Sequence, residues 1–334
     1  MKIVCLPGDG IGPEVTAPAV RVLRAIVPEL ELERRPFGGA AIRETGEPLP
    51  AGTLAACREA DAVLLGAVGS PEFEGAEVRP EQGLIALRRE LDVYANLRPA
   101  RAEGVDLLIV RELVGGLYYG ARGRREDGSV YDTCEYHPSQ IERVARRAFE
   151  FARGRRRRVT SVDKANVLDT SRLWRGIVSD LARDYPEVEL EHVLVDTAAM
   201  QLVQSPERFD VIVTENTFGD ILSDVAAAVT GGLGLAGSAS LGERRPGIFE
   251  PVHGSAPDIA GRGIANPAGM LRSAALMLAH GLESPETSRA LDAAVDEALR
   301  TAPTSDVGGH ATTERFTTAV LEALAHVDAV AVSP

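Results

Sequence analysis

Short apolar runs alternate with amphipathic stretches along most of the chain, and this pattern predicts strands alternating with helices. The clearest predicted helix is Ser139–Arg153, in which apolar residues recur every three or four positions. A second helix is expected from the turn P-G-D-G-I-G-P-E (Pro7–Glu14) to about Val27. Strands are expected at Lys2–Leu6, Glu31–Pro36, Asp61–Ala67, Asp106–Val110, Arg157–Val162, Glu189–Leu194 and Asp210–Thr214. Such alternation is typical of an α/β fold.

One stretch, Tyr118–Tyr136, interrupts this alternation. It is polar and contains several glycines, and its middle, Glu126–Gly128, has the composition of a hairpin turn. We expect a protruding arm that pairs with its twofold mate in a dimer. From Gly269 onward the chain is rich in alanine and has a helical pattern.

The chain has 334 residues, which is enough for two domains with a substantial core. A net charge of −13 argues against nucleic acid or an anionic membrane as partner. The basic run Arg153–Arg158 is interpreted as cations at a helix C-terminus. Cys5, Cys57 and Cys134 are scattered without metal-ligand spacing, which fits a reducing compartment. With no signal-peptide layout and no apolar run of membrane-spanning length, the sequence predicts a soluble cytoplasmic protein.

The basic residues are almost all arginine. Of the 36 lysines and arginines, only Lys2 and Lys164 are lysine. Because an arginine keeps its proton in proteins whereas a desolvated lysine can lose it, an internal lysine in such a chain is a candidate general base. The alternative is that Lys164 remained a lysine by chance.

Two acids stand four residues apart in T-E-N-T-F-G-D-I-L-S-D, just past a predicted strand. On a helix, Asp220 and Asp224 project from the same face and repel each other unless a cation lies between them. Two carboxylates suit Mg²⁺ or Mn²⁺. The alternative is a pair of solvated acids, but the end of a strand is where open α/β sheets bind ligands.

Further candidates lie near the ends of predicted elements. Arg88, Arg98 and Arg111 would form a clamp for carboxylates, although a chance trio is easy to find among so many arginines. Asp196 is a candidate third metal carboxylate, or else the N-cap of a helix at Thr197–Gln204. Tyr118 is a candidate general acid, or else a packing residue of the arm.

The loop His253–Pro267 is rich in glycine, proline and small residues, which let backbone N–H groups approach a phosphate. Within it, Asp258 would accept a hydrogen bond from a ribose hydroxyl and repel the extra phosphate of NADP. The turn at Pro7–Glu14 is not a Rossmann fingerprint, because the third glycine of G-x-G-x-x-G falls on Pro13.

Seven ordered motifs resemble the isocitrate/isopropylmalate dehydrogenase family of metal-dependent β-decarboxylating dehydrogenases, in particular its isopropylmalate branch. They are L-P-G-D-G-I-G-P-E (Leu6–Glu14), L-L-G-A-V-G (Leu64–Gly69), A-N-L-R-P (Ala95–Pro99), V-R-E-L-V-G-G-L-Y-Y-G (Val110–Gly120), S-V-D-K-A-N-V-L (Ser161–Leu168), F-G-D-I-L-S-D (Phe218–Asp224) and E-P-V-H-G-S-A-P-D-I-A-G (Glu250–Gly261). The resemblance covers nearly the whole chain.

The resemblance implies two α/β domains that share a large mixed sheet, unlike a Rossmann fold. A discontinuous NAD-binding domain would comprise residues 1–93 and 232–334. Residues 94–231 would bind substrate and metal and form a homodimer with shared active sites, with the arm at about 118–136. The expected reaction is the oxidative decarboxylation of 3-isopropylmalate to 4-methyl-2-oxopentanoate and CO₂ in leucine biosynthesis.

The resemblance also implies a role for each site residue. Lys164, from the partner subunit, would be the base, and Tyr118 the acid that protonates the enol. Mg²⁺ or Mn²⁺ would bind Asp220, Asp224 and the partner's Asp196. Substrate would contact Arg88, Arg98, Arg111, Asp196, Leu84, Glu81 and Val167. NAD would bind His253, Gly254, Ser255, Ala256, Pro257, Asp258, Ile259 and Asn266.

The substrate expectation depends on Leu84, Ile85 and Leu87, an apolar set that favours an isopropyl group over a third carboxylate. The alternative is a relative acting on another 3-substituted malate, such as homoisocitrate or tartrate. An inactive homologue would have lost a metal or base residue, and all are present. Glu215 departs from the family pattern and is expected to add an acid beside the metal and nicotinamide.

Overall fold

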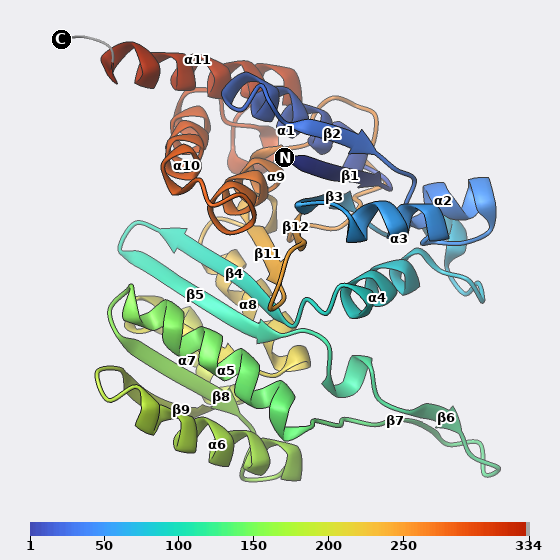
Figure 1. Cartoon of the computed structure of the whole chain (residues 1–334), viewed down its shortest axis with the longest axis vertical. Helices are drawn as coiled ribbons and strands as arrows, with labels where there is room; N and C mark the ends of the chain where they lie inside the picture. The colour runs from blue at the N-terminus through green and yellow to red at the C-terminus, as the bar shows by residue number, and fades with distance from the viewer. Residues whose placement is uncertain (332–334) are drawn as a thin grey trace. The chain divides into compact units, whose positions relative to one another are not determined.

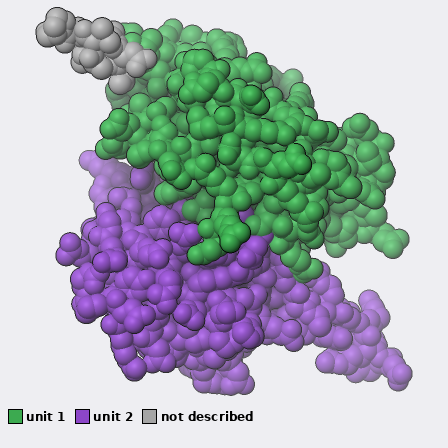
Figure 2. Space-filling view, in the orientation of Figure 1, with its two compact units in different colours: residues 1–91, 233–334 green, residues 92–232 purple. Residues whose placement is uncertain are grey.

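The computed structural model describes residues 1–331, which form two compact units (Figures 1 and 2). Unit 1 comprises Met1–Leu91 and the chain from Leu233 onward, and unit 2 comprises Asp92–Gly232. Each unit has strands flanked by helices, so the predicted α/β architecture is confirmed. No helix in the described part of the chain has the length and apolar character needed to cross a membrane.

Five strands of unit 1 lie in the order β2, β1, β3, β12, β11. Their bounds are β1 Lys2–Gly8, β2 Glu31–Arg34, β3 Ala62–Ala67, β11 Gly237–Leu241 and β12 Gly247–Pro251. Strands β2, β1, β3 and β12 run parallel to one another, and β11 pairs antiparallel with β12. β3 and nearly all of β1 are buried along their lengths, as expected for parallel strands covered on both faces.

The helices of unit 1 are α1 Gly12–Ile26, α2 Gly38–Thr45, α3 Ala51–Arg58, α4 Pro80–Glu90, α9 Ala268–Leu276, α10 Pro285–Thr301 and α11 Thr313–Ala331. Helix α1 contacts β1 and β3, whereas α9 contacts β11 and β12. The end of α9 continues as one π-helical stretch, Met277–Gly281. The glycine-rich turn between β1 and α1 therefore lies at the carboxyl end of a buried parallel strand.

Five strands of unit 2 lie in the order β4, β5, β10, β8, β9. Their bounds are β4 Ala95–Ala102, β5 Val105–Glu112, β8 Arg158–Asp163, β9 Glu189–Leu194 and β10 Val211–Thr214. β4 and β5 form an antiparallel pair, and the others are parallel. In the parallel part, Thr214 lies opposite Arg111 and Val162, and Asp163 lies opposite Leu194. The ends of four parallel strands therefore meet at one edge of the sheet.

The helices of unit 2 are α5 Pro138–Arg153, α6 Asp169–Leu181, α7 Val195–Gln204 and α8 Asn216–Val229. Helices α5 and α6 pack together on one face of the strands and α7 and α8 on the other (Figure 1). The helix predicted at Ser139–Arg153 is confirmed, and all its periodic apolar residues are buried. They are Ile141, Val144, Ala145, Ala148, Phe149 and Ala152.

The predicted arm contains a two-stranded hairpin, β6 Arg122–Arg124 and β7 Val130–Asp132, which Figure 1 shows projecting from unit 2. The turn between the strands includes Glu126–Gly128, so the predicted hairpin middle is confirmed. Val130 is 64% exposed although it is apolar.

The interpretation of Arg153–Arg158 as cations at a helix end is wrong for most of the run, because only Arg153 belongs to α5. Arg155 lies 2.8 Å from the fully buried carboxylate of Asp210 and 3.0 Å from Asp106. The run therefore ties the segment before β8 to the starts of β5 and β10. Buried Asp210 requires such a partner, because an unpaired buried charge is costly.

Candidate active site

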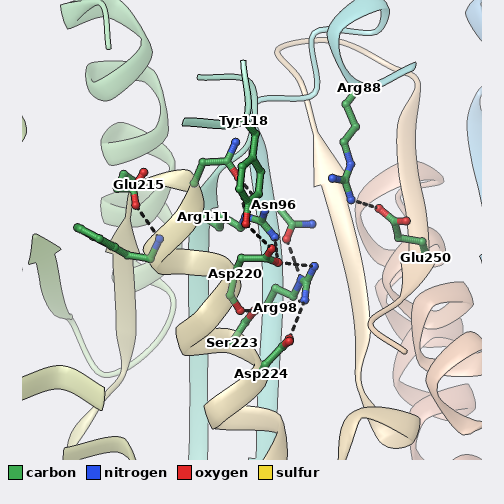
Figure 3. Close-up of polar contacts among 12 residues, drawn as sticks. Arg88, Asn96, Arg98, Arg111, Tyr118, Glu215, Asp220, Ser223, Asp224 and Glu250 are labelled. Atoms are coloured by element: carbon green, nitrogen blue, oxygen red, sulfur yellow. Dashed lines mark hydrogen bonds and ion pairs between the residues drawn. The ribbon is translucent and has the colours of Figure 1, made fainter. Parts of the chain in front are cut away.

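Helix α8 begins directly after β10 and carries both acids of the D-x-x-x-D pattern. Its buried face consists of Asn216, Gly219, Leu222, Ser223, Ala226 and Ala227. Asp220 and Asp224 lie beside that face and point toward Arg98 of β4 (Figure 3). Nη2 of Arg98 is 3.8 Å from Asp220 and Nη1 is 3.6 Å from Asp224. A cation therefore compensates the repulsion expected between the two carboxylates.

The environment of Asp224 disfavours its charged form. Partial burial raises the pKa of its carboxyl group above the ordinary value, the positive charge of Arg98 opposes this, and the nearby charge of Asp220 adds to it. The two carboxylates thus place several oxygen atoms close together, next to the guanidinium groups of Arg98 and Arg111. Hard divalent cations prefer such oxygen ligands, so the residues present fit Mg²⁺ or Mn²⁺.

Arg111 is the most deeply buried charged group of the site, with 2% of its surface exposed. Its Nη1 forms an ion pair with Asp220. Its Nε and Nη2 donate to the side-chain oxygen of Asn216 at 3.0 and 2.7 Å. A Cβ on Gly219 would stand 2.6 Å from Cγ of Arg111, so the arginine stem occupies the space that the glycine leaves. This explains the glycine in F-G-D.

Arg98 reaches the same helix from β4. Its Nε donates to the side-chain oxygen of Asn96 at 2.9 Å and its Nη1 to the hydroxyl of Ser223 at 3.2 Å. The structure therefore brings two of the three predicted substrate arginines, Arg98 and Arg111, to one helix. The third, Arg88, lies on α4 of unit 1 and pairs with Glu250 at 2.7 Å.

Tyr118 ends a 3-10 turn, Gly116–Tyr118, at the base of the arm. Its hydroxyl donates to Oδ2 of Asp220 at 3.0 Å. Burial and the neighbouring charge of Asp220 raise the pKa of Tyr118 to about 12. The phenol therefore keeps its proton at neutral pH, as a general acid must before it reacts.

Lys164 and Asp196 contact each other, with Nζ 2.6 Å from Oδ1. The contact follows from the sheet, because each residue comes one or two positions after the paired ends of β8 and β9. The hydrogen bond from Lys164 is the main cause that lowers the pKa of Asp196. The alternative of an N-cap for Asp196 is wrong: α7 begins at Val195, its N-cap is Leu194, and Asp196 lies in the first turn.

No cluster of three metal-ligating side chains occurs in the described part of this single chain. Asp196 therefore does not join Asp220 and Asp224 within one subunit. Val167, which was expected to contact substrate, lies in the loop after Lys164 and is 62% exposed.

In Figure 3, Glu215 lies apart from Asp220 and Asp224, the two acids predicted to bind metal. It is the N-cap of α8, and its carboxylate accepts from the backbone N–H of Phe218 at 2.6 Å and from the hydroxyl of Tyr136 at 3.1 Å. Burial raises the pKa of Glu215 above its ordinary value. The departure from the family pattern therefore supplies a helix cap.

Leu84 and Arg88 lie four residues apart on one face of α4, and Glu81 is exposed in its first turn. Leu84 and Ile85 are partly exposed. Leu87 is fully buried, so the expectation that it forms part of an accessible apolar surface is wrong. Gly83 and Leu87 form the inward face of the helix.

The loop after β12 has several features of a ligand site. Nδ1 of His253 is 2.9 Å from the carbonyl oxygen of Gly254, whereas its buried Nε2 has no hydrogen-bond partner among the described residues. Burial lowers the pKa of His253, which favours a neutral ring. A Cβ on Gly254 would meet nothing within 4 Å. Ala256 has φ +38°, a conformation uncommon outside glycine that tends to occur at functional sites.

The remaining predicted cofactor residues differ in their environments. Ser255 and Ile259 are half-buried, and Pro257 and Asp258 are exposed. Asn266 is buried and its amide is engaged: Nδ2 donates to Asp306 at 3.0 Å and Oδ1 accepts from the N–H of Ala268 at 2.9 Å. An unsatisfied buried nitrogen, an open glycine and an exposed acid together fit a dinucleotide on this loop.

The sequence analysis did not predict Asn216 and Tyr136 as site residues. Asn216 hydrogen-bonds Arg111, and Tyr136 hydrogen-bonds Asn216. The backbone N–H of Asn216 donates to the hydroxyl of Tyr136 at 3.0 Å, and its side-chain amide contacts Arg111. The signal for Asn216 was its place between the end of β10 and the two aspartates. Tyr136 carried no such signal, because it is far away in the sequence.

Comparisons with known proteins agree with this architecture. The chain matches the isocitrate/isopropylmalate dehydrogenase family over residues 2–323. It is 52% identical to a 3-isopropylmalate dehydrogenase of Deinococcus radiodurans, over 97% of each chain. It is 49% identical to one of Bacillus thuringiensis, over 96% of each. The crystal structure of an isocitrate dehydrogenase from Methylococcus capsulatus is similar, with a TM-score of 0.91, 38% identity, and coverage of 97% of this chain and 99% of that one. The chain belongs to the isocitrate/isopropylmalate dehydrogenase family.

Proposed function

We propose that this protein oxidises and decarboxylates 3-isopropylmalate with NAD⁺, giving 4-methyl-2-oxopentanoate and CO₂, as a cytoplasmic enzyme of leucine biosynthesis. The observation that carries the proposal is the cluster in which Arg98, Arg111 and Tyr118 all contact Asp220. It combines anion-binding groups, a protonated phenol and a carboxylate suited to a metal. The relatives named 3-isopropylmalate dehydrogenase support this choice of substrate.

Asp220 and Asp224 would hold Mg²⁺ or Mn²⁺, and the loop from His253 to Asn266 would hold NAD. When bound, the ion polarises oxygen atoms of the substrate and the dinucleotide accepts the hydride. Asp258 supports NAD over NADP, because an exposed carboxylate repels an additional phosphate and accepts a hydrogen bond from a ribose hydroxyl.

The chain's own residues then have distinct roles. Arg98 and Arg111 bind the substrate carboxylates and fix their orientation. Lys164 takes the proton from the substrate hydroxyl, and Tyr118 delivers a proton to the carbon that loses CO₂. The raised pKa of Tyr118, about 12, keeps that proton available before decarboxylation.

A homodimer would bring Lys164 and Asp196 of one subunit to Asp220 and Asp224 of the other. Its support is that the described part of one chain holds no cluster of three metal-ligating side chains. Exposed apolar side chains on α7 and α8 also favour a covered surface: Met200 is 51%, Val203 63% and Ile221 56% exposed.

A second candidate function is the same chemistry on a tricarboxylate, which the similarity to a solved isocitrate dehydrogenase favours. Leu84 and Ile85 argue for the isopropyl substrate, because a third carboxylate beside them would be desolvated without a partner. The two candidates differ in the group on the third carbon of the malate and share every other step.

The test is NADH formation by the purified protein with Mg²⁺, using 3-isopropylmalate, isocitrate, homoisocitrate, tartrate and malate in parallel. We expect the largest kcat/KM with 3-isopropylmalate. A tricarboxylate with the largest kcat/KM would replace the proposed substrate but keep the reaction class. No turnover with any of them, while metal still binds, would contradict the proposed enzyme.

A further inference from the structure

The turn P-G-D-G-I-G-P-E, Pro7–Glu14, contains none of the residues proposed to bind metal, substrate or NAD or to transfer a proton. It joins β1 to the first turn of α1 in unit 1. It fails as a dinucleotide fingerprint, because Pro13 stands where the third glycine would be. It nevertheless contacts the loop from Ser255 to Asn266 at several points within the same unit.

The first contact is made by backbone groups. The N–H of Ile11 donates to the carbonyl oxygen of Ser255 at 2.8 Å. Gly10 has φ +54°, and a Cβ on it would stand 2.0 Å from that same oxygen. Only glycine fits this approach, so the start of the loop is held against the turn.

The second contact is made by the side chain of Glu14. Oε2 accepts from the backbone N–H of Gly261 at 3.0 Å, and Oε1 accepts from that of Ala265 at 2.9 Å. The hydroxyl of Thr313 lies 3.1 Å from Oε1 and 2.6 Å from the carbonyl oxygen of Ala265, and it donates to one of them. One carboxylate thus holds two points of the loop that are four residues apart.

Between the held points the loop is exposed. Asp258 and Pro257 face solvent. The local backbone hydrogen bonds there run from the N–H of Ile259 to the carbonyl oxygen of Ala256 and from the N–H of Arg262 to that of Ile259, at 3.2 Å each. The shape of this stretch therefore depends on its anchors at Ser255, on one side, and Gly261, on the other. A loop that is ordered before binding loses less conformational freedom when the ligand arrives.

We propose that Glu14 is a positioning residue that holds the Ser255–Asn266 loop in the conformation that binds the dinucleotide. The inference rests on the proposed function, since it takes this loop as the NAD site. Glu14 does not touch the ligand in this account. It acts through the backbone amides of Gly261 and Ala265, which fix where Asp258 and Ile259 lie.

Two substitutions separate the reach of the carboxylate from its charge. Glu14→Gln keeps the length of the side chain but leaves only one acceptor oxygen for two amides. Glu14→Asp keeps the negative charge at the start of α1, which is favourable to that helix, but shortens the side chain. Glu29→Gln is the matched control, because Glu29 is an exposed acid of the same unit that makes no hydrogen bond to the described residues.

The affinity for NADH is measured by fluorescence titration of the full-length protein and its variants. Hydrogen exchange of peptides covering Gly261 and Ala265 is measured without any cofactor. We expect Glu14→Gln and Glu14→Asp each to weaken NADH binding about tenfold, equivalent to about 1.4 kcal/mol, and to speed exchange in the loop. The KM for NAD⁺ should rise while the KM for the malate substrate and kcat at saturation stay near wild type.

Each outcome decides the inference. NADH affinity and loop exchange unchanged in both variants would overturn it while leaving the proposed function intact. Wild-type NADH affinity in Glu14→Asp, together with weakened NADH affinity in Glu14→Gln, would mean that only the negative charge at the start of α1 matters. That result would also overturn the inference. A wild-type protein that binds no dinucleotide would refute both the NAD site and the role of Glu14. Faster exchange with weaker NADH binding, and Glu29→Gln unchanged, supports it.

Discussion

The side-chain oxygen of Asn216 accepts two hydrogen bonds from the guanidinium of Arg111, from Nε at 3.0 Å and from Nη2 at 2.7 Å. The side-chain nitrogen of Asn216 donates to the carbonyl oxygen of Gly115 at 3.0 Å, which fixes the orientation of the side-chain amide. Asn216 is fully buried and Arg111 is 2% exposed, so water does not replace these bonds. The arrangement directs Nη1 of Arg111 toward Asp220.

We predict that Asn216→Ala raises the KM for 3-isopropylmalate about tenfold or more. Two buried N–H groups of Arg111 lose their acceptor, and loss of a hydrogen bond to a charged group costs about 1.5–3 kcal/mol. Asn216→Asp keeps an acceptor for Arg111 but loses the bond to Gly115, so it should recover most of the substrate affinity. Steady-state kinetics of both variants checks this. Equal KM values in wild type and Asn216→Ala would show that Arg111 is oriented by other contacts.

Lys164→Arg should abolish turnover while leaving the fold and metal binding largely intact. The substitution keeps the positive charge beside Asp196, but a guanidinium does not give up its proton under these conditions. The measurement is kcat with 3-isopropylmalate, alongside circular dichroism and Mn²⁺ binding as controls for the fold and the site. Near-normal kcat in this variant would exclude Lys164 as the base.

Much of the fold was predictable because local pattern and tertiary structure agree. The helix α5 has nearly the predicted bounds, since its apolar residues recur with the helical period. The strand β4 was missed because Ala95–Ala102 contains two arginines and a proline that do not alternate regularly. Its strand conformation follows from pairing with β5, which is a non-local interaction.

The site was less predictable than the fold. The spacing of Asp220 and Asp224 predicted their common direction, because helix geometry alone determines it. Spacing does not predict that Glu215 turns into the helix cap, or that Tyr136 supports Asn216 from 80 residues away. Such contacts depend on which segments the chain brings together, and no local pattern carries that information.

Metal binding should stabilise unit 2 measurably. An ion that binds only the folded state raises its stability in proportion to the logarithm of its concentration above Kd. We predict that Mg²⁺ or Mn²⁺ raises the unfolding midpoint reported by Trp174, the only tryptophan, which is buried in this unit. Asp224→Asn should remove most of this shift, because it deletes one of two carboxylates. A metal-dependent shift as large in Asp224→Asn as in wild type would place the ion elsewhere.

A buried acid at the end of β5 is expected to make the stability of unit 2 depend on pH. Glu112 is fully buried, and burial raises its pKa to about 7, although the backbone N–H groups of Val114 and Gly115 donate to it at 3.0 and 2.9 Å and oppose the shift. Below the unfolded pKa of 4.5, both states hold the proton. As pH rises toward 7, the unfolded state releases it first, so stability falls.

We predict that Glu112→Gln removes this part of the pH dependence. From the shift between 4.5 and about 7, wild type should lose about 3 kcal/mol of stability in total, and about 2 kcal/mol of it between about pH 5.5 and about pH 8. A neutral amide has no proton to release, so the loss of stability over the same pH range should be smaller in the variant by about 2 kcal/mol. Urea unfolding followed by Trp174 fluorescence at both pH values gives the two differences. If wild type and Glu112→Gln lose the same amount, Glu112 ionises in the folded state near its ordinary pKa, and the two amide hydrogen bonds compensate its burial.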